Sequence, residues 1–176
     1  MWIFLVSDAF AFGGLLIAHG ILRAGQPRWV APGEPPLAIP FTALLTFLLI
    51  STSFTNVMAW AAAAEGRRRA AAMLLAVTAL GGLLFLAGQY FEWTSLMHEG
   101  LVFGRSRRAS TFYVVTGFHG LHVLVGVAYI LAVLGQYLRR RATAHHVELL
   151  GLYWCFVDFV WIFVFSFVYL VPSALQ

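Results

Sequence analysis

Five long apolar segments, separated by short polar or turn-rich connectors, set the hydrophobic pattern of this chain. A helix needs about 20 apolar residues to cross about 30 Å of hydrocarbon. The segments that reach this length are about 2–22, 38–62, 70–92, 110–138 and 148–171. The pattern therefore predicts an all-α integral membrane protein, a bundle of five transmembrane helices that forms a single domain over residues 1–176. The first segment lacks a basic leader and exceeds a typical signal-peptide core, so we expect a retained helix.

The charged residues lie mainly between these segments. Loops 65–69 and 139–148 hold six arginines close to helix ends, and loops 23–36 and 93–109 hold five. Because positive charge beside helix ends favours the cytoplasmic side, we expect the N-terminus and both triple-arginine loops inside and the C-terminus outside. Lysine is absent while arginine is frequent, which suggests a GC-rich bacterial genome. We therefore expect a multi-pass protein of a bacterial inner (plasma) membrane.

Composition excludes most soluble classes. Hydrophobic residues make up 61% of the chain and charged residues 10%, with a mean hydropathy of +0.86. A single soluble core of this size cannot hide so much apolar surface. The net charge of +4 could suggest nucleic acid, but arginines clustered at helix ends are typical of membrane flanks, so we expect no nucleic-acid partner. The lone Cys155 excludes an intrachain disulfide and a multi-thiolate metal site.

Ionisable groups within the apolar segments are the candidate buried polar or proton-linked residues. They are Asp8, His119, His122 and Asp158, with Glu92 at the predicted end of the third helix, and His19 in the first helix is a further ionisable group. At about 1.5 Å per residue, His122 lies about 17 Å below one surface and Asp158 about 14 Å above the other. These depths nearly coincide, so we predict that His122, or failing that His119, lies against Asp158. A structural tie is the favoured interpretation, and a step in a proton path is the alternative.

Two further acids have simpler interpretations. Asp8 lies about two turns into the first helix, where a hydrogen bond to a neighbouring helix is favoured over proton handling. Glu92 sits among aromatic residues near the outer surface, and its favoured interpretation is anchoring in the interfacial belt.

The histidines do not predict a metal site. The chain has no set of Glu-x-x-His motifs for a di-iron bundle and no converging zinc ligands. A haem held by His19 and His119 is a minor alternative. We therefore predict no metal ligands, no cofactor bound by this chain and no catalytic residue, so that the chain is not an enzyme by itself.

Small polar residues follow the second predicted helix, and glycines recur in the others. Thr46, Ser53, Thr55 and Asn56 predict hydrogen bonds between helices. Tight helix contacts are expected at Gly13, Gly14, Gly81, Gly82, Gly117 and Gly120. Anionic lipid head groups are expected at Arg67, Arg68, Arg69, Arg139, Arg140, Arg141, His145 and His146, with topology-setting charge alone as the alternative.

Two motifs resemble a known family. TFYVVTGFHGLHVLVG (111–126) and VELLGLYWCFVDFVWIFVFSFVYL (147–170) resemble subunit III of haem–copper cytochrome c oxidases, and SDAFAFGG (7–14) and GQYFEW (88–93) fall in the family's order. The five predicted helices match the short bacterial form, which lacks the first two helices of longer members. In the family a buried glutamate occupies the place of Asp8, and histidine is usual where this chain has Cys155.

The resemblance implies an accessory membrane subunit of a proton-pumping terminal oxidase. Such a subunit packs beside subunit I, with subunit II in the same complex, and haem and copper are expected on these partners. It would support proton uptake, complex stability and phospholipid binding during cytochrome c oxidation in aerobic respiration. Subunit III of a quinol oxidase is the alternative. A subunit associated with nitric oxide reductase or a small proton-coupled transporter is less favoured, since no broken helices or inverted repeats are evident.

Overall fold

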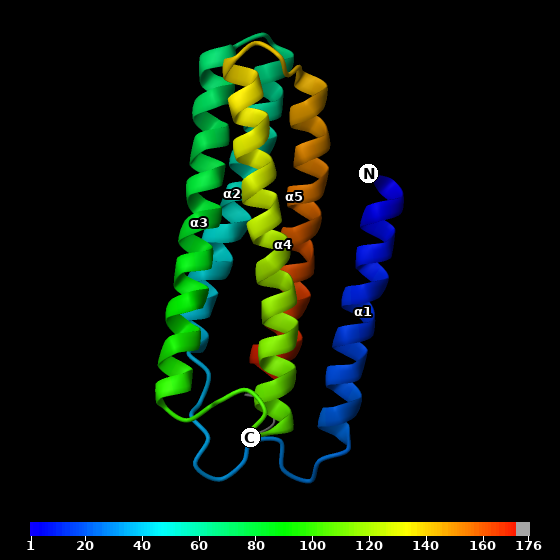
Figure 1. The fold of residues 1–176 in the computed structure, drawn as a ribbon, viewed down its shortest axis with the longest axis vertical. Helices are drawn as coiled ribbons and strands as arrows, with labels where there is room; N and C mark the ends of the chain where they lie inside the picture. The colour runs from blue at the N-terminus through cyan, green and yellow to red at the C-terminus, as the bar shows by residue number, and fades with distance from the viewer. Residues whose placement is uncertain (172–176) are drawn as a thin grey trace.

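The computed structural model describes residues 1–171, which form five long helices joined by short connectors (Figure 1). The helices are α1 (Trp2–Ala24), α2 (Ile39–Ala64), α3 (Arg68–His98), α4 (Arg107–Leu138) and α5 (Ala144–Val164), and α5 continues as the π-helix η1 (Phe165–Leu170). All five are long and apolar enough to cross a membrane. The predicted all-α membrane bundle is therefore confirmed. The largest difference in a boundary is at α3, which runs six residues beyond its predicted end at 92.

The helices divide into a four-helix body, α2 to α5, and a more loosely attached α1. Figure 1 shows α1 at one side of the body, alongside α4 and α5. The buried residues of α1 are Leu5, Phe12 and His19, which recur every seven residues. Such spacing places one buried residue on every second turn of a single narrow stripe. The arrangement means that α1 contacts the body through this stripe, whereas each body helix packs against several others.

The two triple-arginine segments lie at the same end of the bundle. The α2–α3 turn and the α4–α5 loop are neighbours at the top of Figure 1. Gly66 in the first and Arg140 in the second have positive φ angles of 73° and 60°. Left-handed backbone is unfavourable for a residue with a Cβ, so Arg140 is held in its turn by the surrounding structure.

Trp154 fills the centre of the body, where glycines make room for its indole. A Cβ atom on Gly82 would lie 2.6 Å from Trp154, and one on Gly126 would lie 2.8 Å away. The indole Nε1 donates a hydrogen bond to Thr52 Oγ1 at 2.9 Å. Close approach at small residues is what holds helices together where lipid is as apolar as the side chains.

The predicted glycine contacts are only partly correct. Gly81, Gly82 and Gly117 lie against another helix, but a Cβ on Gly13, Gly14 or Gly120 would meet no atom of residues 1–171 within 4 Å, so the helix contacts expected at those three glycines are not formed there. The contacts at Gly88, against Leu45, and at Gly126 were not predicted. A glycine in an apolar helix looks the same in sequence whether it faces lipid or a neighbouring helix.

The predicted polar seam of α2 is confirmed at three of its four residues. Thr46 Oγ1 accepts a hydrogen bond from Trp161 Nε1 at 2.9 Å, and the hydroxyls of Thr55 and Thr78 lie 2.8 Å apart. Ser53 donates to Asp158. Each bond joins α2 to a neighbouring helix, and Asn56 is the exception.

An ion pair at the opposite end of the bundle was not recognised in the sequence. Arg108 Nη1 lies 3.1 Å from Glu34 Oε2, and both of its terminal nitrogens donate to the Pro35 carbonyl at 3.2 Å. The Arg108 and Glu34 side chains are only 5% and 6% exposed. The pair fixes the connector between α1 and α2 onto the first turn of α4.

Candidate functional site

Glu92 lies inside the body at the centre of a hydrogen-bond network. Its Oε1 accepts from Thr42 Oγ1 at 2.8 Å, and its Oε2 accepts from Tyr169 at 3.0 Å and from Gln89 at 3.3 Å. The residue is only 2% exposed. The expected anchoring of Glu92 in the interfacial belt is therefore wrong. Because α3 continues to His98, Glu92 is more than a turn inside its helix and faces α2 and η1.

Asp8 and His122 form the second polar group, at the junction of α1 with α4. Asp8 Oδ2 lies 3.4 Å from His122 Nε2, and the two side chains are 14% and 11% exposed. The aromatic ring of Phe12, one turn along α1, packs edge-on against the imidazole with 5.0 Å between ring centres. Asp8 therefore faces a neighbouring helix as predicted, but through a carboxyl–imidazole contact, since its Oδ2 makes no hydrogen bond within residues 1–171.

The hydrogen bond of His122 to its own helix fixes which ring nitrogen faces Asp8. His122 Nδ1 lies 2.7 Å from the Phe118 carbonyl, and a carbonyl can only accept, so Nδ1 carries a proton. Nε2 is the nitrogen that faces Asp8 Oδ2. The contact thus brings an acid and an imidazole together between α1 and α4.

The predicted pairing of His122 or His119 with Asp158 is wrong. Asp158 instead accepts from Ser53 on α2, and its Oδ1 has no partner within residues 1–171. His119, fully buried, donates from Nε2 to the Val157 carbonyl at 3.2 Å. His119 therefore does tie α4 to α5, but through the backbone next to Asp158.

Depth alone could not give these partners. Successive residues of an α-helix point about 100° apart, so Val157 and Asp158 have similar depths and different neighbours. The depth estimate matched His122 to Asp158, whereas the histidine that contacts this turn of α5 is His119. It contained no information on which way the Asp158 side chain points.

The remaining buried histidine lies among aromatic groups. The ring of His19 packs edge-on against Trp29 with 5.2 Å between ring centres, while His119 packs against Phe85 and Trp161. Over residues 1–171, no three His, Cys, Asp or Glu side chains are grouped so that they could hold a metal ion.

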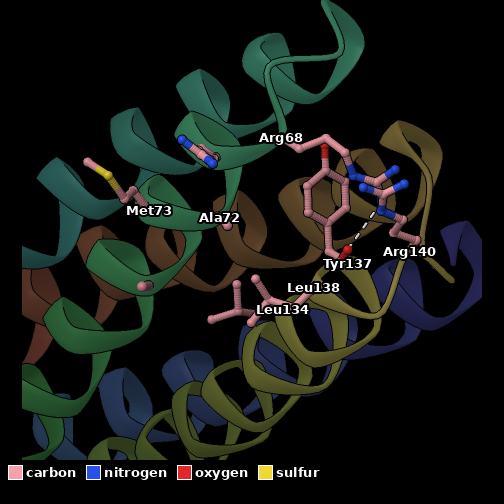
Figure 2. Close-up of a pocket in the computed structure, with 9 residues that line it drawn as sticks. Arg68, Ala72, Met73, Leu134, Tyr137, Leu138 and Arg140 are labelled. Atoms are coloured by element: carbon pink, nitrogen blue, oxygen red, sulfur yellow. Dashed lines mark hydrogen bonds between the residues drawn. The ribbon is translucent and has the colours of Figure 1, made fainter.

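The arginine-rich end carries a groove between α3 and α4, with a volume of about 630 Å³. Figure 2 shows Arg68 and Arg140 at one end of it, beside Tyr137, and Met73 and Leu134 farther along. Arg68 Nη2 donates to the Tyr137 carbonyl at 3.2 Å, and its guanidinium lies 4.9 Å from the centre of the Tyr137 ring. Arg69 is the third arginine in the lining. One end of the groove is thus cationic and the rest is apolar.

The other head-group candidates have local partners or lie outside this groove. Arg67 pairs with Glu65 at 2.6 Å. His145 contacts Glu148 at 3.2 Å. His146 caps the start of α5, where its Nδ1 accepts from the Thr143 backbone N–H at 3.3 Å. Arg139 and Arg141 are exposed in the α4–α5 loop.

Comparison with known proteins gives a consistent result over nearly the whole chain. The family model described as "Cytochrome c oxidase subunit III" matches residues 1–173. Cytochrome c oxidase subunit 3 of Synechocystis is 39% identical over 96% of this chain and 72% of its own length. A probable cytochrome c oxidase subunit 3 of Nocardia farcinica is 37% identical over 96% of this chain and 85% of its own. A quinol oxidase subunit 3 of Bacillus spizizenii is 33% identical over 96% and 84%.

Proposed function

This chain belongs to the cytochrome c oxidase subunit III family, and from that premise we propose that it packs mainly against subunit I of its oxidase, with subunit II in the same complex. It is an accessory subunit of a haem–copper oxidase and a multi-pass membrane protein. The proposal assigns haem and copper to the partner subunits. It also places the chain in a bacterial plasma membrane, with the arginine-rich end of the bundle in the cytoplasm, as charge beside helix ends favours.

Within that complex, we assign the support of proton uptake to the Asp8–His122 pair. The observation that supports the assignment is the 3.4 Å approach of the Asp8 carboxyl to the His122 imidazole between two helices. An imidazole titrates near physiological pH more readily than any other side chain. The pair lies where α1 meets α4 and keeps 14% and 11% of its two side chains exposed, whereas Glu92 is enclosed.

The test is the loss of activity during sustained turnover of the intact oxidase. Asp8→Asn keeps the shape of the side chain but can neither carry the negative charge nor release a proton. We expect normal initial turnover and normal haem content, followed by inactivation several-fold faster than in the wild type. His122→Gln should behave similarly, and Glu65→Gln, at the exposed pair with Arg67, is the control for a change of charge. An unchanged decay in Asp8→Asn would contradict the assignment.

We further propose that the groove between α3 and α4 holds an anionic phospholipid. Arg68, Arg69 and Arg140 would surround the phosphate, and the apolar lining, which includes Leu134, would contact an acyl chain. In the oxidase, Arg68→Gln combined with Arg140→Gln should reduce the amount of phosphatidylglycerol retained after delipidation and re-addition. Arg139→Gln changes a neighbouring charge outside the groove and should have no effect. Equal retention in the double variant would contradict this proposal.

For the electron donor we propose cytochrome c rather than a quinol. The relatives named as cytochrome c oxidase subunits reach 39% and 37% identity, and the quinol oxidase subunit reaches 33%. The purified complex should oxidise reduced cytochrome c directly. Oxidation of quinol without cytochrome c would assign the complex to the quinol oxidases.

A further inference from the structure

A second groove runs between α2 and α5 and contains an unpaired amide. The groove has a volume of about 280 Å³ and is lined by Asn56, Val57, Trp60, Glu148, Gly151, Leu152 and Cys155. It lies in the half of the bundle that contains the arginine-rich loops, because Glu148 is in the first turns of α5. The roles proposed for Asp8, for His122 and for the arginine-lined groove do not involve this second groove.

Asn56 is the group that requires a partner here. It is 0% exposed, and neither its Nδ2 nor its Oδ1 has a hydrogen-bond partner within residues 1–171. A buried amide without partners is unfavourable, and hydrocarbon offers it none. Gly151 borders the amide, since a Cβ added there would lie 3.6 Å from Asn56 Nδ2. The absence of a side chain on Gly151 keeps the amide next to the groove.

Further polar groups follow the same seam towards the centre of the bundle. Glu148, with its side chain 50% exposed, stands at the outer end of the groove. Cys155 lies deeper in the lining, and Asp158, one turn beyond it on α5, accepts from Ser53. From Glu148 to Asp158 is ten residues, or about 15 Å along the helix. Polar atoms are therefore available at successive turns along this distance.

We propose that this groove binds water, which enters beside Glu148, bonds to the Asn56 amide and reaches the Cys155 thiol. The volume exceeds that of several water molecules, each of about 30 Å³ in the liquid, and a bound water needs two to four polar partners. A lipid chain could fill the same space, but it would leave both atoms of the amide unpaired. The hydrated segment ends one turn from Asp158. This inference is independent of the roles assigned to Asp8 and to the arginines.

Cys155 is the natural reporter, because it is the one cysteine of the chain. The purified oxidase in lipid nanodiscs would be treated with a cationic trimethylammonium methanethiosulfonate or an anionic sulfonate analogue. The mass of this chain would then be followed over time. Such charged reagents modify thiols that water reaches. We expect labelling of Cys155, several-fold faster with the cation because Glu148 stands at the entrance. Glu148→Gln should bring the two rates close together.

Two matched substitutions test whether the reagent passes through the groove. Gly151→Leu should block it and suppress labelling, whereas Gly151→Ala adds a Cβ at an ordinary contact distance and should retain labelling. Cys155→Ser gives the background. Labelling by an uncharged benzyl methanethiosulfonate alone would show a groove filled by hydrocarbon and overturn the proposal. No labelling by any reagent, or unchanged labelling in Gly151→Leu, would overturn it as well.

Discussion

Two of the carboxyl groups that meet polar partners on other helices, Glu92 in the body and Asp8 on α1, differ in how completely they are surrounded. Glu92 accepts three hydrogen bonds from two neighbouring elements and its own helix. Asp8 meets a single imidazole, and the pair retains some exposure. Three donors hold the Glu92 carboxyl in one arrangement, whereas the Asp8 carboxyl faces one imidazole and is less constrained. Burial of an acid in a membrane helix therefore does not by itself indicate proton chemistry.

The same contrast extends to how the helices are held. The body is joined by side-chain hydrogen bonds between α2 and both α3 and α5, and by the indole of Trp154 seated against glycines. The stripe of α1 places Leu5, Asp8 and Phe12 at the spacing of a heptad seam. A single polar residue in such a seam specifies register at some cost in stability. We infer that Asp8 also sets the position of α1 along α4.

The contrast between the tightly packed body and the narrow attachment of α1 is tested most strongly by Trp154→Ala. This change removes one of the two fully buried tryptophans of the body and leaves a cavity where α5 meets α2, α3 and α4, so we expect a loss of about 3–5 kcal/mol in stability. The measurement is thermal release of this chain from the purified oxidase. A loss below about 1 kcal/mol, at the level of a surface substitution, would mean that the centre of the body is not where its stability lies.

Glu92→Leu should have the next largest effect. The leucine would leave the Thr42, Gln89 and Tyr169 donors facing an apolar group, which predicts a loss of about 2–3 kcal/mol in the same assay. Glu92→Gln retains the oxygen that accepts from at least one of these donors and is the matched control, with a smaller expected loss. Turnover-linked inactivation should stay normal in Glu92→Gln. Faster inactivation in Glu92→Gln would mean that Glu92 and Asp8 do not differ in function.

Asp8→Asn should have the smallest effect on stability. Asparagine keeps the shape of the aspartate side chain and removes no hydrogen bond of Asp8 Oδ2, so thermal release should shift little. The same variant is expected to inactivate faster during turnover. A large loss of stability together with fast inactivation would instead indicate that Asp8 holds α1 in place and that proton exchange is not needed to explain its role.

The sequence predicts the elements of this fold better than their contacts. Five apolar segments predict five helices, and the threonines and Ser53 of α2 predict hydrogen bonds between helices, because polarity in an apolar segment requires partners. The pairing of Asp158 was missed because depth does not define the direction of a side chain. Glu92 was misinterpreted because the boundary of α3 was placed six residues too early. Arg108 and Glu34 are 74 residues apart in the chain, and neither has a local pattern that identifies the other.

The narrow attachment of α1 has a consequence for synthesis. Its stripe packs against α4 and α5, which are the last helices to be made. About 100 residues separate the end of α1 from the middle of α4, and at about 5–20 residues per second the ribosome needs about 5–20 s to make them. During that interval α1 stands in the bilayer with Asp8 facing lipid or the insertion machinery. Membrane chaperones and early contacts with another subunit would therefore act first on this helix.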